Sequence, residues 1–247
     1  LTNQNIKFNF SNQMLTSISE VIKVSTEKKN KNKKNDIFYW SEGSLGFGTI
    51  FENNSASKKK LKTNGITFGA DRFDKDAGIK GLALRLGKND VSVGFSGGKL
   101  DTDTYNLTYY STSPLQKDNR HLDTIIGIGA LKSDIDNVLD GNKLHGDRNG
   151  KQIYGTLKLK DEIKKGELTL IPAGQLDLGY TLLDSYSESG NSAMRFEKQS
   201  IQSKNIRLSV AAFDQLDREK YNIRRHQKLE YKIDLDRSSN VKYSYIS

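Results

Sequence analysis

The chain has 247 residues and a net charge of +9, with 21 glycines, 2 prolines and no cysteine. The lack of cysteine excludes disulfides, thiol catalysis and thiolate metal sites. The hydrophobic content of 34% is low for a thick dry core, and the sequence has no apolar run of the roughly 18 residues that a transmembrane helix needs. A barrel in which only alternate strand positions are apolar tolerates this composition.

Much of the excess positive charge lies in two short runs, Lys28–Lys34 and Lys58–Lys60. Both runs are expected in solvated loops, which is the usual place for isolated charge runs. The charge is therefore not interpreted as a nucleic-acid site, and no nucleic-acid partner is expected.

The first predicted element is a helix over residues 11–26, inside a linker of residues 1–36. Ser11 is a suitable N-cap, and the apolar period that follows is helical. The apolar face of this helix consists of Met14, Leu15, Ile18, Val21 and Ile22. The lysine- and asparagine-rich run after residue 27 is expected to end the helix.

From residue 37 onward the apolar period changes to two, which is typical of strands with two different faces. Strands are expected over 37–51, 65–73, about 82–86, about 105–110, 122–131, 152–160, 168–182, 205–210 and 228–235, with another from Val241. Residues 132–149 are expected to form a long polar loop. Long connections at one end and short turns at the other are typical of outer-membrane barrels.

The polar faces of these strands carry charges in mid-strand, such as Arg85 and Asp177. So many charges cannot all be buried in a dry core, which predicts a transmembrane barrel with its apolar face outward. A soluble barrel or sandwich with its apolar face inward is the alternative. The expected pore-lining residues are Asp71, Arg85, Asp123, Lys158, Gln175, Asp177, Arg207, Glu230 and Asp234. Gly43, Gly46 and Gly48 are expected to thin the wall of the first strand where the helix approaches.

Five segments carry a family resemblance: NGITFGADRF (64–73), LALRLGKND (82–90), DTDTYNLTYYSTS (101–113), LDTIIGIGALKSDID (122–136) and LTLIPAGQLDLGYTLLDSYSESG (168–190). In order and spacing they resemble the translocator (β) domain of classical autotransporters. The resemblance covers residues 37–247 and implies an all-β, antiparallel, up-and-down transmembrane barrel. About ten of the family's twelve strands fit in this sequence, so the resemblance implies that the chain is a fragment without the C-terminal strands. The resemblance also implies that the helix of residues 11–26 threads the pore as a linker.

The implied function is an outer-membrane translocator for type V secretion in a Gram-negative bacterium. The implied partners are the chain's own N-terminal passenger domain, outer-membrane lipid and lipopolysaccharide, and the barrel assembly machinery. The alternatives are a stand-alone outer-membrane channel or adhesin barrel and a soluble β-barrel binding module. His121, His145 and His226 lack metal-ligand spacing. No catalytic residue, metal site or cofactor is expected, and the chain is not expected to be an enzyme.

Overall fold

In the computed structural model, the fold consists of strands. The structure describes residues 37–51, 58–74, 76–93, 98–115, 119–139, 141–218, 221–235 and 241–246. The predicted helix over 11–26 lies outside the described residues and stays a prediction. Within the described part of the chain, no helix is long and apolar enough to cross a membrane.

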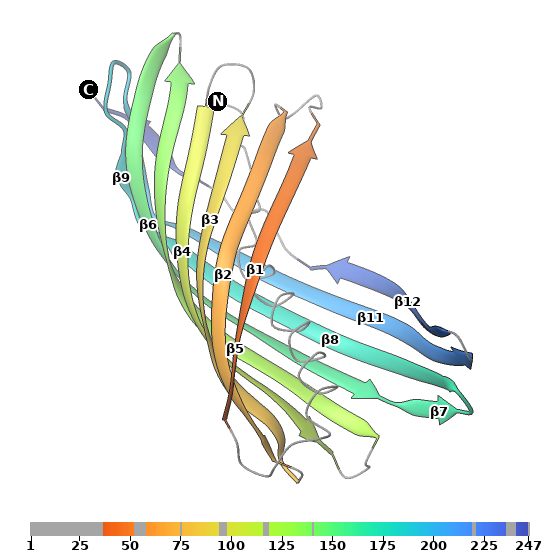
Figure 1. Ribbon diagram of the computed structural model, residues 1–247. Helices are drawn as coiled ribbons and strands as arrows, with labels where there is room; N and C mark the ends of the chain where they lie inside the picture. Colours follow the sequence, from red (N-terminus) through yellow and green to blue (C-terminus); the bar gives the residue numbers. More distant parts are fainter. Residues whose placement is uncertain are drawn as a thin grey trace.

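Nine long strands form one curved antiparallel sheet in chain order (Figure 1). They are β1 (Ile37–Ile50), β2 (Lys59–Asp74), β3 (Gly78–Val93), β4 (Gly98–Pro114), β5 (Arg120–Leu139), β6 (Asn142–Asp161), β8 (Leu168–Leu183), β11 (Gln199–Arg218) and β12 (Tyr221–Asp234). The short β7 (Ile163–Lys165) pairs with the start of β8. This confirms the antiparallel up-and-down order expected from the sequence.

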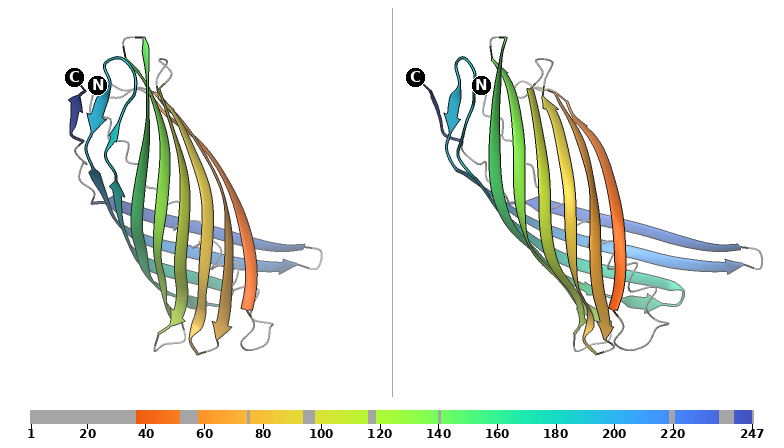
Figure 2. Two further views of the ribbon diagram at one scale, coloured as in Figure 1. Left: turned by 90° about the vertical axis from the view of Figure 1, so that its left-hand side faces the viewer. Right: turned by 60° about the vertical axis from the view of Figure 1, so that its left-hand side comes forward.

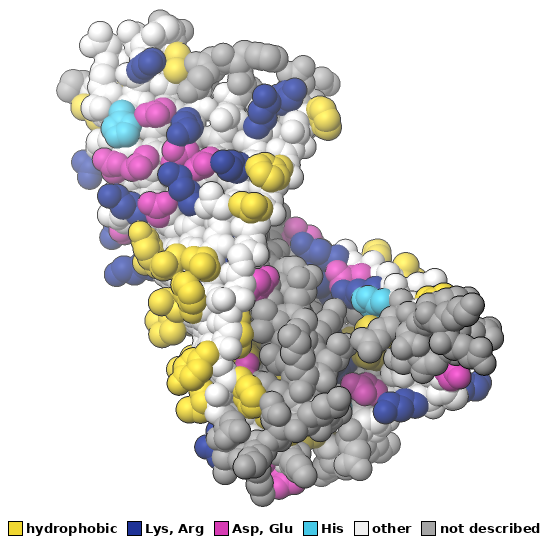
Figure 3. Space-filling view, in the orientation of Figure 1, with side chains coloured by type: hydrophobic (Ala, Val, Ile, Leu, Met, Phe, Trp, Pro, Cys, Tyr) yellow, Lys and Arg dark blue, Asp and Glu magenta, His cyan; other side chains and the backbone are white. Residues whose placement is uncertain are grey.

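Each long strand has an inner and an outer face, and the outer face is the apolar one. On β3 the side chains of Leu82 and Leu84 are 55% and 46% exposed, whereas the intervening Ala83 is 1% exposed and Arg85 is 6% exposed. Figure 3 shows the outward apolar side chains as a band across the strands nearest the viewer, below a zone rich in charge. An apolar outer face is opposite to what a soluble barrel requires.

The loop predicted over residues 132–149 is instead strand. β5 continues to Leu139, β6 begins at Asn142, and their ladder includes Lys132 opposite Asn149. The chain reverses at Gly141, whose φ of 80° suits a tight hairpin turn. The prediction was wrong because the outer face of this segment is polar, so the outward apolar alternation stops. The inner face still includes Ile135, Leu139 and Leu144, and the hydrogen-bond ladder continues.

A second, small sheet is formed by β9 (Tyr186–Ser187), β10 (Met194–Phe196) and β13 (Tyr243–Tyr245). Figure 2 shows it beside one end of β6. The strand expected from Val241 is therefore present as β13, but it pairs with β10. Ring contacts favour this pairing, because the Phe196 ring stacks on that of Tyr186 at 4.7 Å and lies tilted against that of Tyr243 at 6.0 Å.

Candidate functional site

The register places all nine residues expected to line a pore on the inner face. One row of directly opposed residues runs from β2 to β12 and contains Asp71, Asp177 and Asp234. The adjacent row contains Asp123, Lys158, Gln175 and Arg207. Arg85 and Glu230 occupy inward positions in other rows. The nine residues therefore share one face of the sheet, and that this face lines a pore stays a prediction.

The charges on β6, β8, β11 and β12 form a connected network. The Nε atom of Arg207 lies 2.9 Å from Oδ2 of Asp177, and its guanidinium also lies 3.8 Å from the Glu230 carboxylate. The Thr156 hydroxyl and the Gln175 amide donate to the other oxygen of Asp177 at 2.5 and 2.7 Å. The Asp177 side chain is only 2% exposed, so this buried charge depends on its neighbours.

Asp123 forms its ion pair with a lysine that the sequence did not single out. Lys158 is directly opposite Asp123 in the ladder, but the Nζ of Lys160 lies 3.0 Å from the Asp123 carboxylate. Both lysines point inward from β6, two positions apart. A long side chain reaches a diagonal neighbour across strands as easily as the opposed one, so alternation alone could not choose the partner.

On β1 to β4 the inner face combines charge with aromatic rings. Arg85 donates to the hydroxyls of Thr67 at 3.0 Å and Ser44 at 2.7 Å. The Tyr110 hydroxyl donates to Asp71 at 2.9 Å and accepts from the Trp40 indole at 2.8 Å. Asp71 and Arg85, both buried, therefore have hydrogen-bonding neighbours, as burial requires.

Large rings on this side lie over glycines of the next strand. A Cβ atom at Gly81 would lie 2.4 Å from Cζ of Tyr110, and one at Gly127 would lie 2.2 Å from Cζ of Tyr154. These rings belong to a buried apolar group that we call the inner ledge. It consists of Trp40, Phe73, Ile79, Ala83, Tyr110, Ile125 and Tyr154. The ledge was not predicted from the sequence; inward glycines opposite inward aromatics are the signal that could have indicated it.

The predicted glycine wall is only partly on the inner face. Gly46 is opposite Thr63 and Gly48 is opposite Leu61, both at inward positions. Gly43 is instead opposite Ile66, whose side chain is 42% exposed on the outer face. The placement of Gly43 was wrong because it lies an odd number of positions from the other two, and side chains in a strand alternate between faces.

A family model described as the autotransporter beta-domain matches residues 39–246. The chain belongs to this family. It is an outer-membrane translocator barrel of type V secretion in a Gram-negative bacterium, and the family implies a passenger domain. Autotransporter β-domains are a secretion and translocation module and not an enzyme family. The outward apolar band of this β-domain accordingly faces lipid.

One solved structure supports the fold. The translocator domain of the autotransporter NalP from Neisseria meningitidis is similar with a TM-score of 0.71 and 13% identity, over 97% of this chain and 87% of that one. The beta domain of the Bordetella autotransporter BrkA aligns with a TM-score of 0.47 and 13% identity, over 86% of this chain and 97% of that one. A search of curated proteins finds no match.

The β-domain extends well beyond its lipid-facing band at one end. The band ends at a row containing Ile66, Leu86 and Tyr105. Two positions further along β3, β4 and β5, the outward side chains are the charged Lys88, Asp103 and Lys132, and we call this end of the strands, with its outward charged residues, the charged tip. Its outward residues are Lys62, Lys88, Asp90, Lys99, Asp101, Asp103, Lys132, Asp134, Asp136, His145 and Asp147. Among the described residues, no three or more acidic or histidine side chains are grouped so as to hold a metal ion.

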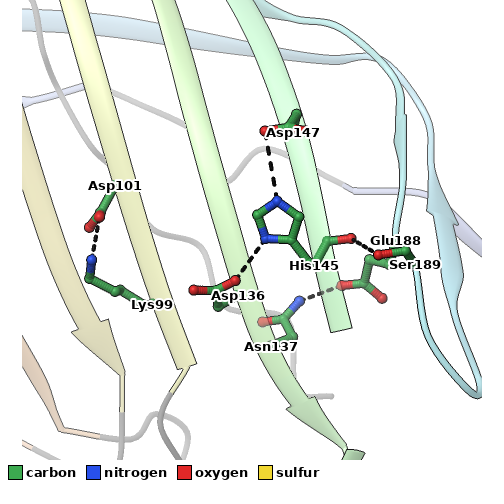
Figure 4. A network of polar contacts seen from close by, with 8 residues as sticks. All are labelled: Lys99, Asp101, Asp136, Asn137, His145, Asp147, Glu188 and Ser189. Carbon is green, nitrogen blue, oxygen red and sulfur yellow. Dashed lines mark hydrogen bonds and ion pairs between the residues drawn. The ribbon is translucent and has the colours of Figure 1, made fainter. Parts of the chain in front are cut away.

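Four aspartates are directly opposed in the charged tip, and basic groups lie next to them. Asp90, Asp101, Asp134 and Asp147 share one row across β3 to β6. Lys99 pairs with Asp101, and Nδ1 of His145 lies 2.8 Å from Asp136 (Figure 4). Like charges directly opposite on a sheet are destabilising, so these basic groups offset repulsion along the row.

The same tip holds residues 184–198, which connect β8 and β11. His145 and Ser189 exchange backbone hydrogen bonds of 3.2 and 2.7 Å. The Glu188 carboxylate accepts from the Asn137 amide (Figure 4). Arg148 donates to the backbone carbonyls of Asp184 at 2.7 Å and Glu197 at 3.1 Å. This connection is therefore fixed against the inner side of β5 and β6.

We expect this attachment to weaken as the pH rises. The hydrogen bond to Asp136 raises the pKa of His145, and the hydrogen bond with Asp147 raises the pKa of Asp134. Both groups bind protons more tightly when folded, so the histidine contributes stability below about pH 6.5 that is lost as the pH rises through its folded pKa. Hydrogen exchange of residues 184–198 should be slower at about pH 6 than at about pH 8.5.

The control for this prediction is His145→Gln, which removes the titrating group next to Asp136. The raised pKa of Asp134 has an effect of the same sign, because its protonation relieves repulsion with Asp147. Protection of residues 184–198 in the variant should change little over this pH range. Equal pH dependence in the variant and the parent protein would show that His145 does not control the attachment.

Proposed function

We propose that the inner face of this β-domain lines a hydrated channel that holds residues 1–36 as a linker to the passenger, with residues 37–247 as the barrel. The observation that supports it best is the segregation of side chains: charged and amide groups on one face of every long strand, leucine and isoleucine on the other. The carboxylates of Asp71, Asp177 and Asp234, in one inner row, would keep the channel hydrated.

We assign the charged tip to the extracellular side. The longest described connection, residues 184–198, is at this end. At the other end only three residues separate β2 from β3, and only two separate β11 from β12. Outer-membrane barrels have long extracellular loops and short periplasmic turns. β1 then starts at the periplasmic end with Ile37. A passenger upstream of β1 must therefore be connected to the surface through the channel.

Within the channel, we propose that the inner ledge seats the apolar face of the linker helix. That face, with Met14, Leu15, Ile18, Val21 and Ile22, needs apolar wall in an otherwise polar lumen. The glycines of β1 offer no apolar side chain, whereas the ledge offers Trp40, Tyr110 and Ile125 in one buried group. Apolar contact of this kind would fix the rotation of the helix.

Cysteine crosslinking can test this contact between the linker helix and the inner ledge, because the chain has no cysteine of its own. Ala83→Cys places a thiol on the ledge, and Leu84→Cys places one on the outer face one position away. A short bifunctional thiol reagent should join the ledge thiol to a cysteine introduced at Ile18 or Val21, and should join the outer-face thiol to neither. Crosslinking from the polar positions Ser19 and Lys23 that is as efficient as from Ile18 would contradict this orientation.

We further propose that lipopolysaccharide contacts the charged tip and that the barrel assembly machinery inserts this β-domain. The first proposal is supported by the outward lysines beside the aspartate row, which lie just beyond the lipid-facing band on the assigned outer side. The second is supported by family membership. Depleting the assembly machinery should leave the protein sensitive to periplasmic protease; unchanged insertion would contradict it.

A further inference from the structure

An apolar groove of about 390 Å³ lies on the outer face where β6, β8, β11 and β12 meet. Its walls include Leu159, Leu208, Val210, Leu229 and Tyr231. The volume falls within the roughly 300–1,000 Å³ typical of ligand sites. The groove is part of the lipid-facing band and not of the channel, so the translocator function does not account for it.

The groove exists because β8 carries small outward residues between large ones. Gly174 is opposite Leu159 on one side and Leu208 on the other, and Pro172 is opposite Val210. A Cβ atom at Gly174 would meet only Cδ2 of Leu208, at 3.9 Å. The floor therefore lies low along β8, and the leucines of the neighbouring strands form its sides.

A charged pair lies at the turn end of the groove. Asp161 lines the groove itself, and its carboxylate accepts two hydrogen bonds from Arg120, at 2.6 and 2.7 Å. The Arg120 and Asp161 side chains are 42% and 28% exposed. A guanidinium binds phosphate well, and a carboxylate has further acceptor sites for an ammonium group. The apolar groove, with a cation and an anion at its end, is therefore complementary to the acyl chain and head group of a zwitterionic lipid.

We propose that this groove binds one acyl chain of a phospholipid with a phosphate and an ammonium group in its head, from the leaflet at the short-turn end of the barrel. The chain lies over Gly174 between Leu159 and Leu208, and the head group contacts Arg120 and Asp161. Because the outer face is surrounded by hydrocarbon in the outer membrane, an acyl chain is the apolar group that is always present to fill it.

Native mass spectrometry of the full chain, released from detergent after incubation with phosphatidylethanolamine, tests the proposal. Gly174→Leu fills the groove, and Gly43→Leu is the matched control, because it adds the same side chain to the outer face where a Cβ meets nothing within 4 Å. The parent protein and Gly43→Leu should each retain one lipid, and Gly174→Leu should retain at least about tenfold less.

Three outcomes would overturn the proposal. They are no retained lipid on the parent protein, equal retention by Gly174→Leu, and equal loss in both variants. A dimer that Gly174→Leu disperses would also overturn it, because the groove would then be a contact between two copies. The head-group assignment is tested with phosphatidylglycerol, which lacks the ammonium group. The parent protein should prefer phosphatidylethanolamine, and Asp161→Asn should lose that preference; equal retention of the two lipids by the parent protein would refute the assignment.

Discussion

Arg207→Leu should destabilise the β-domain by about 3–5 kcal/mol, because removing one member of a buried ion pair leaves the other charge uncompensated. The Asp177 side chain is 2% exposed and lies 2.9 Å from the Arg207 guanidinium. The variant keeps the bonds from Thr156 and Gln175, but neither carries a positive charge. The lost free energy of unfolding is measured by urea titration of the protein folded in lipid vesicles, as the shift in the unfolding midpoint.

Two further variants isolate the cause of this effect. Arg207→Leu combined with Asp177→Asn should recover most of the loss, since an amide oxygen still accepts from Thr156 without carrying charge. Arg225→Leu is the matched control on the outer face, where Arg225 pairs with Asp214 but is 54% exposed. Exposed pairs contribute about 0–1 kcal/mol. Equal losses for Arg207→Leu and Arg225→Leu would show that burial does not set the cost.

The two faces of the wall could be read from the sequence because the side-chain period of a strand is local. Leu84 and Arg85 are adjacent, and alternation alone assigns one to lipid and the other to the lumen. The same rule excludes Gly43 from a face that includes Gly46. Alternation thus predicted the sheet and the sorting of the candidate site, wherever one face was apolar.

Features that depend on register between strands could not be predicted in this way. The segment 132–149 has a polar outer face because it extends beyond lipid, and its inner face mixes Ile135 and Leu144 with Ser133 and Arg148. The outward apolar positions that indicated the other strands are therefore missing here. The partner of Asp123 is Lys160 and not the opposed Lys158. The inner ledge forms because Tyr110 is opposite Gly81, a pairing between β4 and β3. Each of these requires knowing which residues face one another across the sheet.

The position of the lipid can be tested with Leu176→Lys, which should lower the free energy of unfolding by about 2–4 kcal/mol if residue 176 lies at the bilayer midplane. Leu176 is 37% exposed on the outer face, with Leu157 and Ile206 opposite it on the two neighbouring strands. An ammonium group there cannot reach the lumen and must be solvated by thinning or snorkelling. The urea midpoint in lipid vesicles again reports the loss.

A control lysine on the inner face has to be chosen from the neighbouring charges as well as from the alternation of side chains. From the alternation alone, Gln175→Lys should cost little. Gln175 is, however, opposite both Lys158 and Arg207, and it donates to Asp177. A third cation there should be unfavourable, whereas Ser209→Lys faces Glu230. We therefore expect a small cost at Ser209, a larger one at Gln175 and the largest at Leu176. Equal costs at Ser209 and Leu176 would mean that lipid does not contact the leucine face.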